Sequence, residues 1–143
     1  MLYIIYIVRR LIVFYYYFFI GVTLTKPVHI SLDAMGGDNA PVAVISGAAQ
    51  SKVRYPNLSF SFFGDKDILI PLIEASKLSD CSKLIHTNEV IGANDKPSIA
   101  LRKGKNSSMG MSIQLVKSGK ADAVVSAGNT GALLVISKLN LKM

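Results

Sequence analysis

Apolar residues along most of the chain alternate between two spacings. From Val28 onward they recur first at every second position, which is typical of a strand, and then at every third or fourth position, which is typical of an amphipathic helix. This change between strand-like and helix-like spacing repeats to the end of the chain. Strands are predicted at 28–32, 58–63, 84–86 and 121–126. Helices are predicted at 41–54 and 68–75, as a short piece from Pro97, at 107–117 and at 129–140.

This succession of strands and helices predicts the α/β class. It favours an open, doubly wound, mainly parallel sheet with helices on both faces and right-handed crossovers. The strand at 121–126 is nearly continuous in apolar residues, so we expect it to be buried on both faces. Ligands of such sheets bind beyond the carboxyl ends of the strands. Three loops are therefore candidate binding segments, at 33–39, 96–108 and 126–131.

The first 25 residues differ from the rest, since 20 of them are apolar. A membrane span needs about 20 consecutive apolar residues, and extending the run at 11–22 backward places Arg9 and Arg10 near its middle. The segment also lacks the pattern of a signal peptide. Three interpretations stay open: residues outside the working fold that follow from a start assigned too early, a membrane-inserted segment, or an extra strand or helix. The predicted domain is 26–143.

Charge and cysteine content exclude several classes of protein. The 117 residues after Lys26 carry 13 basic and 9 acidic residues, and no basic run accompanies their aromatic residues, which argues against a nucleic-acid partner. The single Cys81 cannot form an internal disulfide, and no Cys/His cluster has the spacing of a metal site. We therefore expect no bound metal and a reduced, cytoplasmic setting.

The first loop joins two carboxylates to two glycines. Asp33 ends a predicted strand, and Gly36 and Gly37 stand where the backbone turns sharply or approaches a ligand closely. With Asp38, the loop carries carboxylates that suit either general-base chemistry or the orientation of neighbouring groups. A plain tight turn is the structural alternative.

The third loop follows a strand and opens a helix. Free backbone amides and the positive end of the helix dipole at such a junction favour an oxygen-rich anion such as phosphate. Ser126, Asn129 and Thr130 add hydroxyl and amide donors. The structural alternative is a helix N-cap formed by Asn129 or Thr130.

The middle segment, 96–108, places basic residues directly before the start of a predicted helix. Arg102 and three lysines precede Ser107 and Ser108, a hydroxyl-rich beginning of a predicted helix. An anion site is favoured for Arg102 and the two serines, and a solvated charged face is the alternative. Fingerprints of P-loop ATPases, of dinucleotide binding and of the nucleophile elbow are absent from the sequence. His29 and His86 fall on predicted strands, where ordinary packing is the expectation.

Three stretches together resemble the bacterial phosphate acyltransferase of phospholipid synthesis: LDAMGGDNAP (32–41), KPSIALRKGKNSSM (96–109) and SGKADAVVSAGNTGALL (118–134). The resemblance runs in order from Val28 to Leu141. It implies acyl phosphate formation from acyl carrier protein thioester and inorganic phosphate, without an organic cofactor. It also implies a fold like that of the isocitrate and isopropylmalate dehydrogenases and of phosphotransacetylase, a homodimer, and a cytosolic enzyme with peripheral membrane association beside a downstream membrane acyltransferase.

The loops and the resemblance together assign the site. Asp33 and Asn129 are predicted to be catalytic. Phosphate or substrate binding is predicted for Gly36, Gly37, Asp38, Arg102, Ser107, Ser108, Ser126, Gly128, Thr130 and Gly131.

Members of the resembled family are more than twice this length, so the sequence suggests a truncated copy whose sheet is incomplete. We expect such a chain to have little acyltransferase activity by itself and to expose a sheet edge. Three alternatives remain: an inactive gene fragment, a membrane-anchored non-catalytic module, and an unrelated enzyme that binds a phosphorylated ligand.

Overall fold

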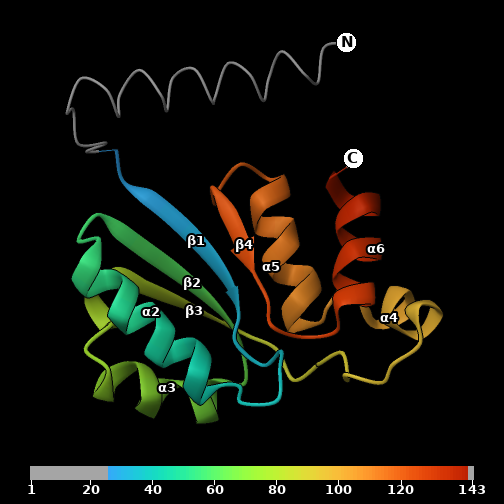
Figure 1. Cartoon of the computed structure of the whole chain (residues 1–143), viewed down its shortest axis with the longest axis horizontal. Coiled ribbons are helices and arrows are strands. Elements are labelled where there is room, and N and C mark those ends of the chain that lie inside the picture. The colour runs from blue at the N-terminus through green and yellow to red at the C-terminus, as the bar shows by residue number, and fades with distance from the viewer. Residues whose placement is uncertain (1–25, 142–143) are drawn as a thin grey trace.

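Four parallel strands form the centre of the computed structural model, which describes residues 26–141, and they lie in the order β3-β2-β1-β4 (Figure 1). The strands are β1 (Val28–Asp33), β2 (Leu58–Gly64), β3 (Ser82–His86) and β4 (Ala123–Val125). The helices are α2 (Val42–Arg54), α3 (Lys66–Ala75), α4 (Pro97–Lys103), α5 (Ser108–Lys117) and α6 (Thr130–Leu141), with a 3₁₀ turn at Ser79–Cys81. The α/β class and the predicted succession of elements are confirmed.

One prediction about the sheet is wrong. β4 is only three residues long, and its residues Ala123 and Val125 are exposed, so it is not buried on both faces. It also pairs with β1 alone in the described part of the chain, which makes it an edge strand there. Val125 is 53% exposed. A continuous apolar run shows that a segment is hydrophobic, but it does not show whether a second strand or helix covers it.

Helices α2 and α3 cover one face of the sheet, and large apolar side chains fill the space between. Alternate residues of the strands point to this face, among them Leu32, Phe60 and Phe62. Ile45 of α2 and Leu69 of α3 pack against them. Fully burying a side chain of this size stabilises the fold by about 1.5 to 3 kcal/mol, so this cluster is the main core.

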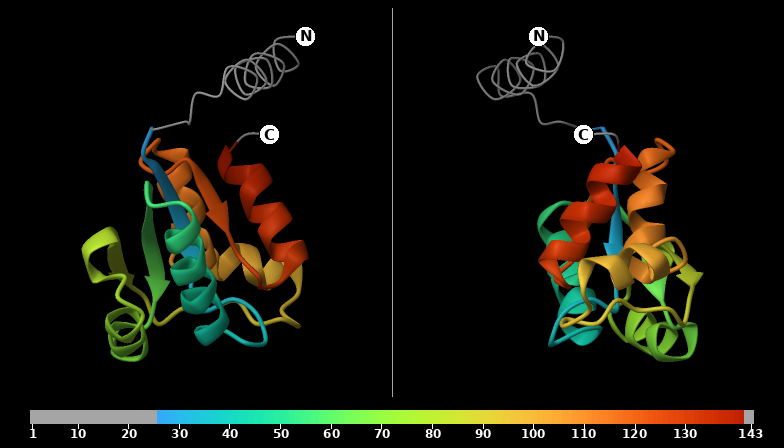
Figure 2. Two further views of the ribbon diagram at one scale, coloured as in Figure 1. Left: turned by 60° about the vertical axis from the view of Figure 1, so that its left-hand side comes forward. Right: turned by 90° about the vertical axis from the view of Figure 1, so that its right-hand side faces the viewer.

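The opposite face of the sheet carries small polar residues and receives α5. The Ser31 hydroxyl donates a 2.9 Å hydrogen bond to the Ser112 carbonyl, which ties β1 to α5. A second apolar cluster then joins α5 to its neighbours α4 and α6, with Met109, Ile113 and Ile136 buried within it. Figure 2 shows α2 and α5 on opposite sides of the sheet. The predicted covering of both faces is therefore confirmed.

The strand order reverses direction at β1. The chain moves outward from β1 to β2 and β3, and then crosses to the other side of β1 to form β4. Such a reversal separates the loops that follow the two central strands and opens a crevice at their carboxyl ends, which is where ligands of doubly wound sheets bind. The loops at 33–39 and 126–131 follow β1 and β4.

No helix among residues 26–141 has the length and apolar character that crossing a membrane requires.

Candidate active site

Asp33 and Ser126 meet where β1 and β4 end. In the parallel register Leu32 pairs with Val125, so the residues that follow them lie side by side. The Ser126 hydroxyl donates a 2.7 Å hydrogen bond to Asp33 Oδ2 and accepts a 3.2 Å hydrogen bond from the Gly128 amide. Asp33 is buried, with 1% of its surface exposed. The first and third predicted loops therefore contact each other.

Glycines allow these two loops to pack backbone against backbone. A Cβ atom on Gly36 would overlap Asp33 Oδ2, and a Cβ atom on Gly128 would lie 3.2 Å from the Gly36 Cα. Gly37 has a φ of +108°, and a Cβ atom there would lie 2.9 Å from the Ala127 carbonyl oxygen. Side chains at these positions would therefore push the loops apart. The glycines thus allow the two loops to pack closely, and their predicted role in binding stays a prediction.

Two of the predicted site residues lie outside this cluster. Asp38 is exposed and takes no part in the hydrogen bonds around Asp33. Arg102 is exposed in the last turn of α4, a short helix that packs against α6. Neither side chain has a contact in the structure that assigns it a ligand.

Asn129 anchors the start of α6. Its side-chain nitrogen lies 3.3, 3.0 and 3.0 Å from the carbonyl oxygens of Gly92, Ala93 and Asp95. Its side-chain oxygen accepts a 3.0 Å hydrogen bond from the Ala132 amide, as an N-cap does. The side chain thus fixes α6 to the segment after β3, and in this arrangement its own donors are engaged. Its predicted catalytic role stays a prediction.

The first amides of α6 are the donors that the third loop offers to a ligand. Helix α6 begins at Thr130, and the amides of Thr130 and Gly131 come before the first intrahelical hydrogen bonds. Both residues are exposed, and no backbone acceptor contacts either amide within residues 26–141. Since the helix dipole places about half a positive charge at this end, an anion is the favoured ligand.

The start of α5 is buried beside these loops. The Ser107 hydroxyl caps α5 by accepting from the Gly110 amide at 3.1 Å, and it donates to the Gly104 carbonyl at 3.1 Å. The Ser108 amide donates to the Glu89 carbonyl at 2.9 Å. The Ser108 hydroxyl is also buried, but it has no hydrogen-bond partner among the described residues. Ser107 is therefore a structural cap, whereas Ser108 retains an unused donor and acceptor.

The segment 87–95, directly after β3, was not among the predicted binding loops, although it supports the site. Thr87 donates through its hydroxyl to the Asn106 carbonyl at 2.7 Å and accepts from the Glu89 amide at 3.1 Å, which holds the start of α5. Residues 92–95 receive the Asn129 amide. The only available signal was position, because this segment also follows the carboxyl end of a strand.

An apolar groove of about 580 Å³ opens next to Asp33, between α2 and the β1–β4 edge. It is bounded by Leu32, Val44, Leu58, Phe60, Val125 and Ala127, among other residues. The groove lies on the α2 side of the sheet, next to the exposed Val125 of β4, and its end at Ala127 belongs to the third loop. A hydrocarbon chain fits such a lining.

The opposite end of β1 carries the one described group with a clearly shifted pKa. His29 Nδ1 lies 2.7 Å from Ser59 Oγ, and Nε2 lies 2.8 Å from Ser61 Oγ. Partial burial, helped by the positive charge of Lys83, holds the pKa of His29 below its ordinary value of 6.5, and Asp122 opposes the shift. This histidine lies at the amino end of the strand and takes no part in the candidate site. Within residues 26–141, no three His, Cys, Asp or Glu side chains are grouped as a metal site would require.

Comparison with known proteins decides the family. Residues 28–143 match the family described as fatty acid synthesis protein. The chain belongs to this family. The match includes both loops of the candidate site and the whole four-stranded sheet.

Named relatives in the family are bacterial phosphate acyltransferases. The chain is 49% identical over 121 residues to the phosphate acyltransferase of Azorhizobium caulinodans, an alignment that covers 83% of this chain and 34% of the relative. It is 48% identical over 122 residues to that of Beijerinckia indica, which covers 84% of this chain and 32% of the relative. The chain therefore spans about a third of the length of these relatives.

Proposed function

We propose that the chain provides the phosphate-binding part of a phosphate acyltransferase that transfers an acyl group from acyl carrier protein to inorganic phosphate. The observation that carries the proposal is the junction of β4 and α6, where free helix amides lie beside the Asp33–Ser126 hydrogen bond at the reversal point of the sheet. The name of the relatives supports the same reaction class. The substrates, the homodimer and the cytosolic location with peripheral membrane association are part of this proposal.

In the proposed reaction a phosphate oxygen attacks the carbonyl carbon of the thioester. A carbon–oxygen bond forms, the carbon–sulfur bond breaks, and the proton of hydrogen phosphate passes to the leaving thiolate, so acyl phosphate and free thiol result. Phosphate bound at the amides of Thr130 and Gly131 is held in place by donors that need no reorganisation. The protein thus contributes orientation and charge stabilisation rather than a covalent intermediate.

Asp33 and Asn129 act in this account as positioning residues. Asp33 fixes the Ser126 hydroxyl, and Asn129 fixes the first turn of α6. A buried carboxylate directly against phosphate would repel it, so the hydrogen bond from Ser126 is the arrangement that lets both lie in one site. The apolar groove beside Asp33 supports an acyl substrate, because it would place a hydrocarbon chain next to the bound phosphate.

The complete fold is part of the same proposal. A four-stranded parallel sheet in the order β3-β2-β1-β4, with helices on both faces, is compatible with the sheet of the isocitrate and isopropylmalate dehydrogenases. We expect further strands to extend the sheet beyond β4.

A chimaera tests the proposed function. In the Azorhizobium caulinodans enzyme, the matching third is replaced by residues 28–143 of this chain, and acyl phosphate is trapped with hydroxylamine. We expect acyl phosphate to form, and Thr130→Pro in the chimaera to raise the KM for phosphate, because the substitution removes an amide donor at a helix position that tolerates proline. A chimaera that folds and dimerises but forms no acyl phosphate would contradict the proposal.

A further inference from the structure

Charge is distributed unequally between the two halves of the chain. Residues 27–95 contain five basic and eight acidic side chains, whereas residues 96–143 contain eight basic side chains and the single acid Asp122. The helices α4, α5 and α6 therefore belong to a strongly basic half. One of its cations, Lys103, forms an ion pair with Asp95 at 3.7 Å.

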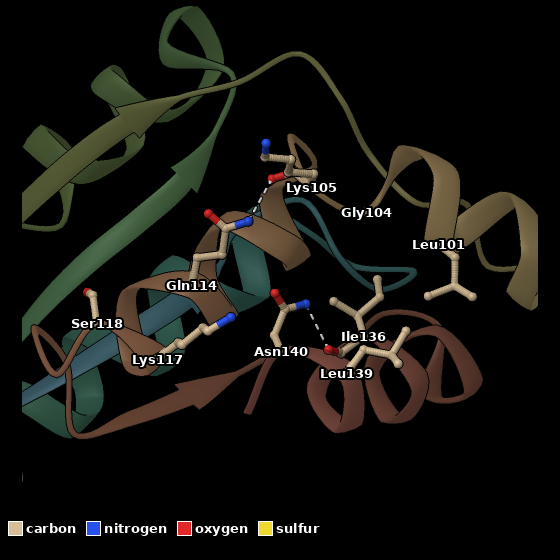
Figure 3. A pocket seen from close by; sticks show the side chains of 9 residues that line it. All are labelled: Leu101, Gly104, Lys105, Gln114, Lys117, Ser118, Ile136, Leu139 and Asn140. Carbon is tan, nitrogen blue, oxygen red and sulfur yellow. Dashed lines mark hydrogen bonds between the residues drawn. The ribbon is translucent and has the colours of Figure 1, made fainter. Parts of the chain in front are cut away.

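A groove of about 690 Å³ runs between these three helices (Figure 3). Leu101 of α4 and Ile136 and Leu139 of α6 provide its apolar wall. Leu139 is 62% exposed and Leu101 is 42% exposed, so the wall is open to solvent. An exposed apolar surface with a polar rim is typical of a site for a macromolecular partner.

Cations and amides form the other side of the groove. Lys105 and Lys117 lie at its rim, and the side chains of Gln114 and Asn140 line it between them (Figure 3). Gln114 donates a 3.5 Å hydrogen bond to the Lys105 carbonyl, and Asn140 donates a 2.9 Å hydrogen bond to the Ile136 carbonyl. Both lysines are exposed, and the described structure shows an ion pair for neither.

We propose that this groove docks an acidic amphipathic helix of a protein partner, with apolar side chains of the helix against the exposed Leu101 and Leu139 and its carboxylates against Lys105 and Lys117. An amphipathic helix in a groove is a recurrent mode of recognition, and complementary charge gives it orientation and speed of association. A lipid surface fits less well, because hydrocarbon chains would offer no hydrogen-bond donor to the side-chain oxygens of Gln114 and Asn140, whose side-chain nitrogens alone are bonded within the described structure.

One end of the groove lies near the candidate active site, whereas Lys117 and Leu139 at its other end belong to the last turns of α5 and α6. Gly104 and Lys105 line the groove, and the chain continues directly from them to Ser107 and Ser108 at the start of α5. A partner docked along the groove would reach the carboxyl edge of the sheet with its end at Lys105, and a group carried at that end would lie near the site. In this respect the inference rests on the proposed function, in which the acyl group arrives on a carrier protein.

Binding of fluorescently labelled acyl carrier protein to the full 143-residue chain tests the inference. We expect saturable binding that weakens as salt is raised. The double substitution Lys105→Glu and Lys117→Glu should weaken binding by about tenfold or more, because it reverses charge at the rim. Leu139→Ala should weaken it as well. The control is Lys26→Glu with Lys66→Glu, which changes the net charge equally at positions outside the groove, and circular dichroism verifies that each variant is folded.

Inorganic phosphate binding to the same samples separates this inference from the proposed function. Carrier binding that depends on the groove supports the inference, whether or not phosphate binds; without phosphate binding, only the proposed function fails. Phosphate binding without carrier binding overturns the docking surface alone. Equal weakening by the control pair also overturns it. Binding to phosphatidylglycerol vesicles that is lost on Lys105→Glu and Lys117→Glu, with no carrier binding, overturns it in favour of a lipid surface.

Discussion

At the scale of single residues, the site depends on glycines at positions where neighbouring atoms leave no room for a side chain. Gly36 faces the Asp33 carboxylate directly, and Gly128 faces the Gly36 Cα. The sequence could predict that paired glycines permit a close approach, but it could not identify the approaching group. That group is another loop of the same sheet edge, brought there by the pairing of β1 with β4.

Gly36→Ala should destabilise the chain by about 1 to 3 kcal/mol, because the new methyl group overlaps Asp33 Oδ2 and the loop must move. It should also weaken phosphate binding. Gly47→Ala in α2 is the matched control, since nothing lies within 4 Å of its Cβ position and alanine favours a helix by about 1 kcal/mol. Urea unfolding measures both. Equal stability of the two variants would show that the loops do not approach as described.

Replacing Ser107 and replacing Ser108 by alanine should affect stability differently. Ser107→Ala removes the cap of α5 and should lower the free energy of unfolding by about 1 kcal/mol. Ser108→Ala removes a buried hydroxyl that has no partner in the described structure, so it should leave stability unchanged or raise it by about 1 kcal/mol. If Ser108 contacts bound phosphate, the same variant weakens phosphate binding. Thermal unfolding with and without phosphate measures both effects, and a loss of stability in Ser108→Ala would contradict this assignment.

His29 should make stability depend on pH. Its pKa in the folded chain is below 6.5, so the unfolded chain binds the proton more readily. The contribution of neutral His29 to the free energy of unfolding is therefore fully present above pH 6.5. It is lost as the pH falls from 6.5 toward the lowered pKa of the folded chain. Between about pH 8 and about pH 5, His29→Asn should show a smaller decrease in the free energy of unfolding than the native chain. An equal decrease in both proteins would indicate that His29 is not responsible.

At the scale of elements, apolar periodicity predicts whether a segment is a strand or a helix. It is a poorer guide to which other elements cover that segment. Within residues 26–141, the apolar spacing located the four strands and four of the five helices, because it follows from the geometry of each element alone, and Pro97 marked the start of the short helix α4. It failed for β4, whose apolar run is exposed at an edge. It also passed over the segment after β3, because Thr87 and Glu89 act through single hydrogen bonds that leave no periodic pattern.

The proposed phosphate site depends most on the first turn of α6. Asn129 caps it from one side, while the amides of Thr130 and Gly131 stay available on the other. Sequence analysis left two interpretations of this loop open, a helix cap and an anion site. In the structure these are compatible, since the capping oxygen satisfies the third amide of the helix and leaves the first two for a ligand.

At the scale of the whole molecule, two surfaces lie beside the reversal point of the sheet. The apolar groove along α2 and β4 ends at the third loop, and the basic groove between α4, α5 and α6 has one of its ends next to the start of α5. Hydrophobic pattern and charge counts could indicate that such surfaces exist. Their position relative to the site depends on the crossover that places β4 beside β1, which only the tertiary structure provides.

Calorimetric titration of the native chain, Thr130→Ala and Thr130→Pro with inorganic phosphate shows whether the first amides of α6 bind an anion. Alanine removes only the hydroxyl, whereas proline at the first helix position also removes the amide donor and preserves the helix. We expect the native chain to bind phosphate saturably, alanine to weaken binding modestly, and proline to weaken it by about tenfold, in line with the loss of a charge-assisted hydrogen bond. Absence of saturable binding, or equal affinity in all three proteins, would contradict an anion site at the start of α6.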